Sequence, residues 1–446
     1  MKKTMILCFA LLFIGNTAFS QPKIGNETEA EKKERMQWWS DARFGMFIHW
    51  GLYALPARHE WVKNYERLTT EQYQKYFEAF NPVKYDPSRW ARAAKAAGMK
   101  YAVLTTKHHE GFCLFDSKYT DYKATNTKAR RDLVREFVEA FRAEGLKVGF
   151  YYSLIDWHHP DFTIDCNHPQ RVSTAEEYKA LNEGKNMENY RTYLRNQLKE
   201  LLTQYGKIDI LWLDYSYPGE NGKGREDWNS IELIKMIRKL QPGIIINNRA
   251  DLNDYTDGYD FETPEQVSAS ELAKYRGKYW ETCQTFSGSW GYFRDETTWK
   301  TEKELLDLLI TSTANGGNLL LNVGPTAKGE FDYRANNALE KIGNWMEAHG
   351  NAIYHCTYAP EEYQLPTNVN ARLTYHPGSK RLYLHLFDYP SQGTVTLPGY
   401  GQKIKYAQLL NDDSEILFQE YESDLILELP KQKPPFEVTV IELILK

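Results

Sequence analysis

The sequence predicts an α/β fold, a (β/α)8-like barrel, followed by a C-terminal antiparallel β-sandwich. Two patterns favour this fold. Between about residues 44 and 350, short apolar runs alternate with longer amphipathic segments, as strands buried on both faces alternate with helices in a parallel barrel. After about residue 354, apolar and polar residues alternate within short runs separated by turn residues, which is typical of a sandwich. An open doubly wound sheet is the alternative, but no GxGxxG motif follows an early strand.

The apolar runs define eight expected barrel strands, and the amphipathic segments between them define the main helices. The strands are expected over 44–49, 101–108, 147–154, 208–214, 244–249, 259–263, 278–282 and 318–323. The helices are expected over 71–80, 87–97, 131–144, 187–205, 230–240 and 305–313. Asp86-Pro87 and Thr301…Glu304 carry the residues that begin helices, an N-cap before proline and a capping box.

The chain divides into three parts. Residues 1–20 combine Lys2 and Lys3, an apolar run over 5–14 and the small residues Ala18 and Ser20, which predicts a cleaved signal peptide. The run is too short to span a bilayer, so we expect an exported chain, periplasmic or secreted, without membrane insertion. Residues 21–355 are expected to form the catalytic barrel and residues 356–446 the sandwich. The sandwich strands are expected over 372–376, 381–387, 393–397, 403–410, 415–420, 424–429 and 436–445.

Composition narrows the class of partner. The 446 residues are 42% hydrophobic and 14% aromatic, enough for a large core in two domains. The net charge of −5 and the absence of a long basic run exclude nucleic acid as an expected partner. Outside the predicted signal peptide the cysteines are Cys113, Cys166, Cys283 and Cys356. Their wide spacing resembles no zinc site and does not demand disulfides.

Polar residues gather where the expected strands end, which in a parallel barrel is the edge that carries function. Asp214 follows an apolar strand, where a carboxylate is costly unless it is paired, so a catalytic role is favoured. His108 and His109 are adjacent, and adjacent strand residues face opposite ways. Because no HExxH pair accompanies them either, a metal site is not indicated.

Eight stretches of the chain resemble the retaining α-L-fucosidases of glycoside hydrolase family 29. Their order and spacing make the resemblance specific, and the tail is similar to the family's C-terminal sandwich. The form of two stretches, Thr-Pro-Glu-Gln and Ser-Trp-Gly-Tyr, is similar to the branch that prefers α-1,3/1,4-linked fucose. The eight stretches are 38–51, 106–112, 151–153, 212–214, 248–249, 263–265, 290–292 and 318–325.

The resemblance implies a mechanism and a set of site residues. It implies that Asp214 is the nucleophile and Glu265 the general acid/base, with Glu281 and then Glu262 as alternatives for the second role. It implies no metal and no organic cofactor, and a fucosylated oligosaccharide or glycan as substrate. The fucose pocket is expected to contain His49, Glu60, Trp61, His108, His109, Tyr152, Trp212, Arg249 and Trp290.

Two other functions fit parts of this pattern. A related exo-glycosidase could act on galactose, which carries a hydroxyl where fucose carries its methyl. A catalytically inactive sugar-binding protein is disfavoured, because Asp214 and the candidate acids are all present. For the tail, a structural role is favoured over glycan binding.

Overall fold

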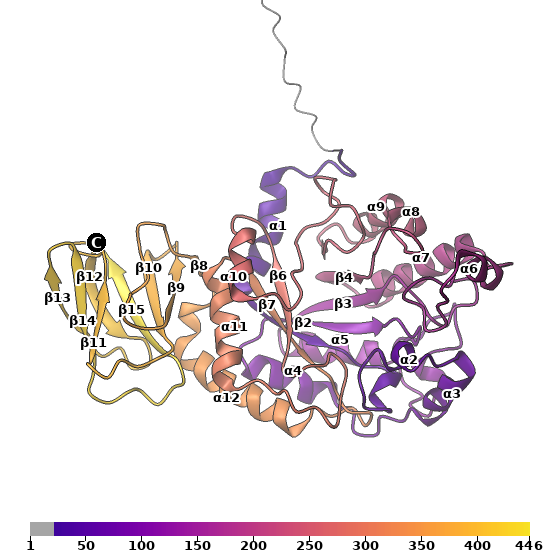
Figure 1. Cartoon of the computed structure of the whole chain (residues 1–446), viewed down its shortest axis with the longest axis horizontal. Coiled ribbons are helices and arrows are strands. Elements are labelled where there is room, and N and C mark those ends of the chain that lie inside the picture. The colour runs from indigo at the N-terminus through magenta and orange to yellow at the C-terminus, as the bar shows by residue number, and fades with distance from the viewer. Residues whose placement is uncertain (1–21) are drawn as a thin grey trace, which may run out of the picture.

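The computed structural model describes residues 22–446, so the predicted signal peptide lies outside the described residues. A strongly curved, seven-stranded parallel sheet forms the larger domain, with helices around it (Figure 1). The strand order is β5-β4-β3-β2-β1-β7-β6. The strands are β1 (Phe44–Ile48), β2 (Tyr101–Lys107), β3 (Lys147–Ser153), β4 (Ile210–Asp214), β5 (Ile245–Ile246), β6 (Glu281–Thr285) and β7 (Asn318–Val323).

The expected strand over 259–263 does not form as a strand, and this segment instead joins the two edges of the sheet. Phe261 makes a single parallel bridge to Asn247 after β5, and Glu262 makes one to Trp280 before β6. Pro264 follows closely and has no N–H to donate, which limits the pairing that the segment can extend. The barrel is therefore closed at this point by single bridges in place of a full strand.

The helices follow the amphipathic pattern. All six predicted helices form, and the cap of α11 is a full capping box in which Glu304 N donates to Thr301 Oγ1 (3.3 Å) and Thr301 N to Glu304 Oε2 (2.7 Å). The helices are α1 (Glu29–Ala42), α2 (Val62–Tyr65), α3 (Thr70–Ala79), α4 (Pro87–Ala96), α5 (Leu133–Ala143), α6 (Ala175–Leu181), α7 (Met187–Gln204), α8 (Arg225–Trp228), α9 (Ser230–Leu240), α10 (Ala269–Leu272), α11 (Glu302–Ala314) and α12 (Tyr333–His349). None of these helices is both long and apolar enough to cross a membrane.

Helix α1 was not predicted, and it closes the end of the barrel where the strands begin. Its Met36 and Trp39 are buried in the core that fills the barrel, together with Phe47, Tyr151 and Trp212. The buried positions of α1, Met36, Trp39 and Ala42, all lie in its C-terminal half and the first half is largely charged, so the helix lacks an apolar stripe along its whole length. The helix is held by contacts that only the folded barrel provides.

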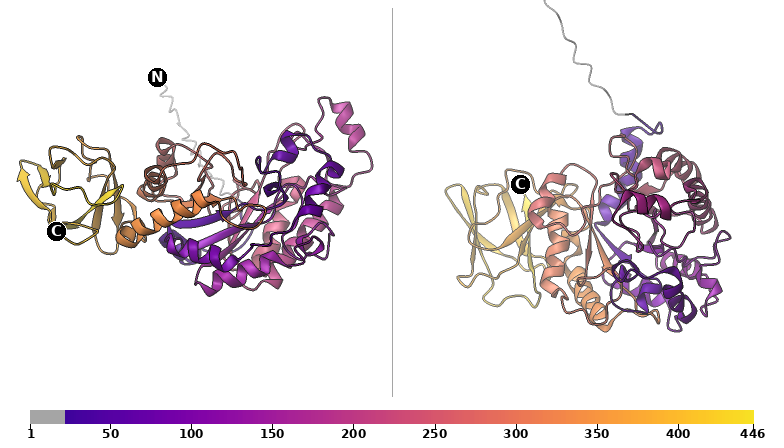
Figure 2. Two further views of the ribbon diagram at one scale, coloured as in Figure 1. Left: turned by 90° about the horizontal axis from the view of Figure 1, so that it is seen from below. Right: turned by 45° about the vertical axis from the view of Figure 1, so that its right-hand side comes forward.

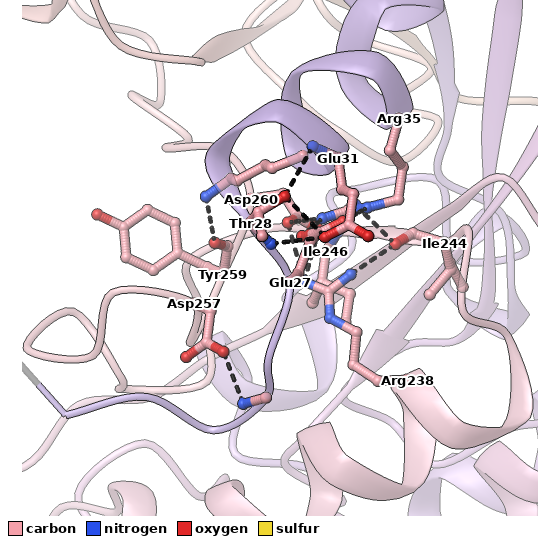
Figure 3. Close-up of polar contacts among 12 residues, drawn as sticks. Glu27, Thr28, Glu31, Arg35, Arg238, Ile244, Ile246, Asp257, Tyr259 and Asp260 are labelled. Carbon is pink, nitrogen blue, oxygen red and sulfur yellow. Dashed lines mark hydrogen bonds and ion pairs between the residues drawn. The ribbon is translucent and has the colours of Figure 1, made fainter.

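A buried carboxylate attaches α1 to the closing segment (Figure 3). Asp260 Oδ1 accepts from Arg35 Nη2 (2.7 Å), and its Oδ2 accepts from Arg238 Nη2 (2.8 Å) and Ile246 N (2.8 Å). Both arginines also donate to the carbonyl of Ile244. Burial raises the pKa of Asp260, but Arg238 and Arg35 outweigh it and hold that pKa below its ordinary value. The cluster joins α1, α9, β5 and the segment that closes the barrel.

The C-terminal domain contains two antiparallel sheets, as the alternating pattern predicts. The seven predicted strands correspond to β9–β15, and a short β8 precedes them. The five-stranded sheet has the order β12-β15-β10-β9-β8 and the three-stranded sheet the order β11-β14-β13. The strands are β8 (Thr357–Tyr358), β9 (Ala371–His376), β10 (Arg381–Leu386), β11 (Thr394–Leu397), β12 (Ile404–Leu409), β13 (Leu417–Tyr421), β14 (Asp424–Glu428) and β15 (Thr439–Leu445).

The two domains share buried apolar surface. The C-terminal domain lies beside α11 and α12 (Figure 2). Tyr383 and Val438 of this domain belong to the same buried core as Trp345 of α12, and Trp345 Nε1 donates to the carbonyl of Val438 (2.9 Å). The sandwich therefore covers apolar surface that the barrel helices would otherwise expose.

Candidate active site

A cavity of about 300 Å³ opens where the barrel strands end. This volume is at the lower end of the range of about 300–1,000 Å³ for small-molecule sites, and it suits a single sugar ring. Aromatic and ionisable side chains from six strands and their following loops surround it. The lining residues are Phe47, His49, His59, Glu60, Trp61, Tyr65, His108, His109, Tyr151, Trp212, Asp214, Tyr215, Arg249, Glu265, Gln266, Cys283, Gly288 and Trp290.

Asp214 is the last residue of β4 and is nearly enclosed, with 12% of its side chain exposed. Its Oδ2 accepts from the Tyr151 hydroxyl (2.7 Å), and its Oδ1 accepts from Arg249 Nη1 (3.2 Å). Burial raises the pKa of Asp214 to about 6, because Arg249 and Tyr151 offset only part of the cost of removing the carboxylate from water. The side chain is a buried carboxylate that ionises near neutral pH.

Arg249 contacts two carboxylates at once. Its Nη1 reaches Asp214, and its Nη2 donates to Glu265 Oε2 (2.8 Å), whose side chain is 42% exposed. The guanidinium lies over the Trp212 ring, 4.9 Å from its centroid, and Nε donates to Thr263 Oγ1 (2.9 Å). One rigid cation therefore holds a buried and an exposed carboxylate at the same cavity.

Two of the cavity histidines have defined tautomers. Asn322 Nδ2 donates to the carbonyl of Trp290 (2.7 Å), so its Oδ1 accepts from His49 Nδ1 (2.6 Å). Ser153 Oγ donates to the carbonyl of Ile155 (2.7 Å), so it accepts from His109 Nδ1 (2.8 Å). Each ring therefore keeps Nε2 as an acceptor.

These histidines are neutral at the pH where enzymes ordinarily work. Burial lowers the pKa of His49 to about 3, and burial together with neighbouring positive charge lowers the pKa of His108 and His109 well below the ordinary value. Neutral rings with a free acceptor nitrogen suit the hydroxyl groups of a neutral sugar.

Glu60 lies in the loop after β1 and is buried. Its Oε2 accepts from Gly291 N (2.9 Å) and Ser289 Oγ (3.2 Å), which fixes the loop that carries Trp290. The Trp290 ring lies 5.1 Å from the His49 ring. Glu60 thus connects two loops that line the cavity.

Ten of the predicted site residues meet in the cavity, but Tyr152 does not. Its hydroxyl donates to Gln197 Oε1 of α7 (2.8 Å), so its ring faces the helix layer. The preceding residue Tyr151 lines the cavity instead, because neighbouring residues of a strand point to opposite faces. His108 and His109 both line the cavity, since β2 has already ended at Lys107 and a turn follows.

Two of the three candidate acids also lie elsewhere. Glu281 begins β6 at the opposite end of the barrel, where it accepts from the Tyr101 hydroxyl and burial raises its pKa to about 7. Glu262 forms an ion pair with Lys278 (2.8 Å). Of these three candidates, Glu265 is the one that lines the cavity with Asp214.

Three cavity residues have positive φ without being glycine, and sequence reasoning did not identify any of them. They are His59 (φ 117°), Tyr215 (φ 82°) and Gln266 (φ 47°), and each is adjacent to a carboxylate of the cavity: Glu60, Asp214 or Glu265. Strained backbone of this kind persists where the surrounding structure forces it, and it concentrates at functional sites. No sequence pattern predicted that these non-glycine residues would have positive φ.

Within residues 22–446, Cys113, Cys166, Cys283 and Cys356 are free thiols. Across the same residues, no group of three or more His, Cys, Asp or Glu side chains is placed to hold a metal ion.

Comparison with known proteins places this geometry in a family. Residues 12–351 match the family model for α-L-fucosidase. The structure superposes on α-L-fucosidase isoenzyme 1 from Paenibacillus thiaminolyticus with a TM-score of 0.85 and 46% identity, over 93% of this chain and 99% of the other.

Two more distant relatives agree. One is a trapped covalent intermediate of a family 29 α-L-fucosidase from Bacteroides thetaiotaomicron in complex with 2-fluoro-fucosyl fluoride, with a TM-score of 0.80 and 30% identity over 96% and 98% of the two chains. Tissue α-L-fucosidase from Mus musculus is 30% identical over 81% of this chain and 79% of its own.

A parallel barrel with paired carboxylates at the carboxyl ends of its strands defines the molecule as a glycoside hydrolase. With the family match extending over most of the barrel domain, the chain belongs to the α-L-fucosidase family.

Proposed function

We propose that the protein is an exo-acting, retaining α-L-fucosidase in which Asp214 is the nucleophile and Glu265 the general acid/base. One observation carries the proposal: Arg249 holds both carboxylates at a cavity the size of a monosaccharide. Retaining glycosidases need carboxyl groups about 5–5.5 Å apart, and two carboxylates that share one guanidinium suit that close spacing.

The mechanism has two steps. Asp214 attacks the anomeric carbon and forms a fucosyl ester, while the bond to the leaving oxygen breaks and Glu265 donates its proton to that oxygen. Glu265 then takes a proton from water, the water oxygen attacks the anomeric carbon, and the ester bond to Asp214 breaks. The trapped covalent intermediate of the Bacteroides thetaiotaomicron relative supports this route.

The walls of the cavity suit fucose. The neutral His49 and His109 offer acceptor nitrogens to ring hydroxyls, and Phe47, Trp212 and Trp290 provide apolar surface for the methyl group. His108 Nδ1 is buried without a partner in the described part of the chain, and a hydroxyl could satisfy it.

The depth of the cavity supports exo action. Four of its lining residues, Phe47, Tyr151, Trp212 and Cys283, also belong to the core that fills the barrel, so the cavity is closed below. A terminal sugar fits such a site, and an internal sugar of a chain does not.

Linkage and location complete the proposal. The Thr263-Pro264-Glu265-Gln266 and Ser289-Trp290-Gly291-Tyr292 stretches favour α-1,3/1,4-linked fucose on oligosaccharides or glycoconjugates. The first 20 residues favour export to the periplasm or beyond the cell.

Chemical rescue by azide tests the two carboxylate roles. We expect Asp214→Ala to lower kcat by about 10³-fold or more, with azide giving the inverted fucosyl azide. We expect Glu265→Ala to impair poor leaving groups most, with azide giving the retained product. Retained azide from Asp214→Ala would overturn the nucleophile assignment.

Controls separate the remaining assignments. Glu281→Ala and Glu262→Ala test carboxylates placed outside the cavity, and azide rescue in either variant would transfer the acid/base role. Cleavage of nitrophenyl α-galactoside but not of the α-L-fucoside would refute the substrate. A panel of 2'-fucosyllactose and Lewis-type trisaccharides tests the linkage.

A further inference from the structure

An exposed aromatic ring stands at the mouth of the cavity. Tyr65 ends α2 and is 63% exposed, yet it lines the same cavity as Asp214. Its ring centroid lies 5.1 Å from that of His59 and 6.1 Å from that of Trp61, at interplanar angles of 43° and 32°. The three rings form a surface that leads out of the cavity.

The surface continues inward to the nucleophile. Trp61 lies 5.4 Å from Tyr215, which directly follows Asp214 in the chain. Trp61 also packs edge-on against Trp157 (5.2 Å). An aromatic wall therefore runs from beside the reacting carboxylate to solvent, and Tyr65 is its outermost member.

The turn that carries Tyr65 is anchored, although the ring itself is exposed. Lys63 Nζ donates to the carbonyl of Trp157 (3.2 Å) and Asn64 Nδ2 to that of Asn167 (2.6 Å), and both side chains are buried. Beyond α2, Glu66 accepts two hydrogen bonds from Arg58 (2.7 and 2.8 Å). The ring is thus presented from a fixed backbone, which lowers the entropy lost when a ligand stacks on it.

We infer that Tyr65 forms the platform of the leaving-group subsite, where it stacks against the pyranose ring of the sugar that bears fucose. The inference rests on the proposed function, because fucose in the closed cavity leaves the next ring at the mouth. Sugar rings have apolar C–H faces that pack on aromatic rings. The substrate class that this platform favours is a fucosylated oligosaccharide, in preference to a fucoside whose leaving group has no ring.

Two substrates separate this role from the chemistry. Fucosyl fluoride has no ring in its leaving group, whereas a fucosylated trisaccharide that the wild type cleaves has one. We expect Tyr65→Ala to lower kcat/KM for the trisaccharide about 10-fold more than for the fluoride, mainly through KM, since one aromatic contact contributes on this scale. Tyr65→Phe should behave like the wild type, because it keeps the ring.

The matched control is Tyr333→Ala. Tyr333 is 78% exposed and lies outside the cavity, so this variant should hydrolyse both substrates at the wild-type rate. Equal losses on both substrates, no loss on either, or equal effects of Tyr65→Phe and Tyr65→Ala would overturn the inference. An altered oligomeric state of Tyr65→Ala in size-exclusion chromatography, together with equal losses of kcat/KM on both substrates, would also overturn it. A wild type that hydrolyses neither fucosyl fluoride nor any fucosylated trisaccharide would instead refute the proposed function.

Discussion

At the residue scale, the balance of forces on Asp214 decides how the site behaves. Burial disfavours its charge, whereas Arg249 and the Tyr151 hydroxyl favour it, and the net result is a pKa of about 6. In the proposed mechanism Asp214 must be ionised to attack, so the protein would keep a charged carboxylate in a place where that charge is costly. Two measurable consequences follow, one for the rate and one for stability.

The rate should fall as Asp214 is protonated. We expect kcat/KM to rise with pH and to reach half its plateau near pH 6, the pKa of this carboxylate in the free enzyme. Arg249→Met removes the positive charge that lowers this pKa, so its acidic limb should move to higher pH. A limb at the same pH in wild type and variant would contradict the assignment, whatever the loss in rate.

Stability should change in the opposite sense. The pKa of Asp214 is higher in the folded state than the value of about 3.9 expected when unfolded. The stability that the protonated carboxyl contributes is therefore lost as the pH rises from about 3.9 to about 6. Asp214→Asn should therefore raise the free energy of unfolding by about 1–3 kcal/mol at pH 7.5 and by almost nothing at pH 3.5. Urea unfolding at both pH values measures this, and a gain that is equal at both would point to another cause.

Single residues also show how far the sequence predicts the site. Strand-end polarity and the family resemblance predicted Asp214, Arg249 and Glu265 as site residues, and these three line one cavity. They misplaced Tyr152 by one position, because the face of a strand depends on register. Glu281 lies far from Asp214, at the opposite end of the barrel. The sequence does not reveal this distance, because only the fold decides which end of the barrel the residue occupies.

At the scale of elements, helix α1 and the closing segment depend on each other. Strands with continuous apolar runs were predicted within a few residues, because burial on both faces leaves a strong pattern. Helix α1 leaves no such pattern, and the segment over 259–263, predicted as a strand, forms only single bridges. Both are stabilised by distant partners, since Asp260 contacts Arg35 from α1 and Arg238 from α9. Tertiary contacts, rather than local preference, determine this part of the fold.

Removing one arginine from this cluster should destabilise the barrel. We expect Arg35→Met to lower the free energy of unfolding by about 2–4 kcal/mol, because it leaves buried Asp260 with one cationic partner fewer. The matched control is Arg294→Met, which breaks the exposed pair with Asp295 and should leave stability nearly unchanged. Equal effects of the two variants in urea unfolding would show that the buried cluster is not what secures α1.

At the scale of the whole molecule, the C-terminal sandwich completes the core of the barrel domain. Trp345, Tyr383 and Val438 share one buried cluster across the boundary, and the Trp345 indole donates to the sandwich backbone. The favoured structural role of the tail is a prediction that this shared surface supports.

Truncation after residue 355 tests it. We expect the truncated chain to aggregate or to unfold at a much lower temperature, because the apolar surface of α12 becomes exposed. Thermal unfolding and size-exclusion chromatography measure both effects. A monomeric truncated chain with the Tm of the full chain would show that the barrel folds alone.

The cavity is closed beneath Asp214 by Phe47, Tyr151, Trp212 and Cys283. This closure determines the order in which molecules enter and leave the site. In the proposed mechanism, a cavity closed below requires the sugar nearer the outside to leave before water can reach the fucosyl ester, so fucose leaves last. Free fucose should then compete directly with substrate for the resting enzyme. An alcohol that enters the mouth of the cavity before water does would receive the fucosyl group and leave as a new glycoside.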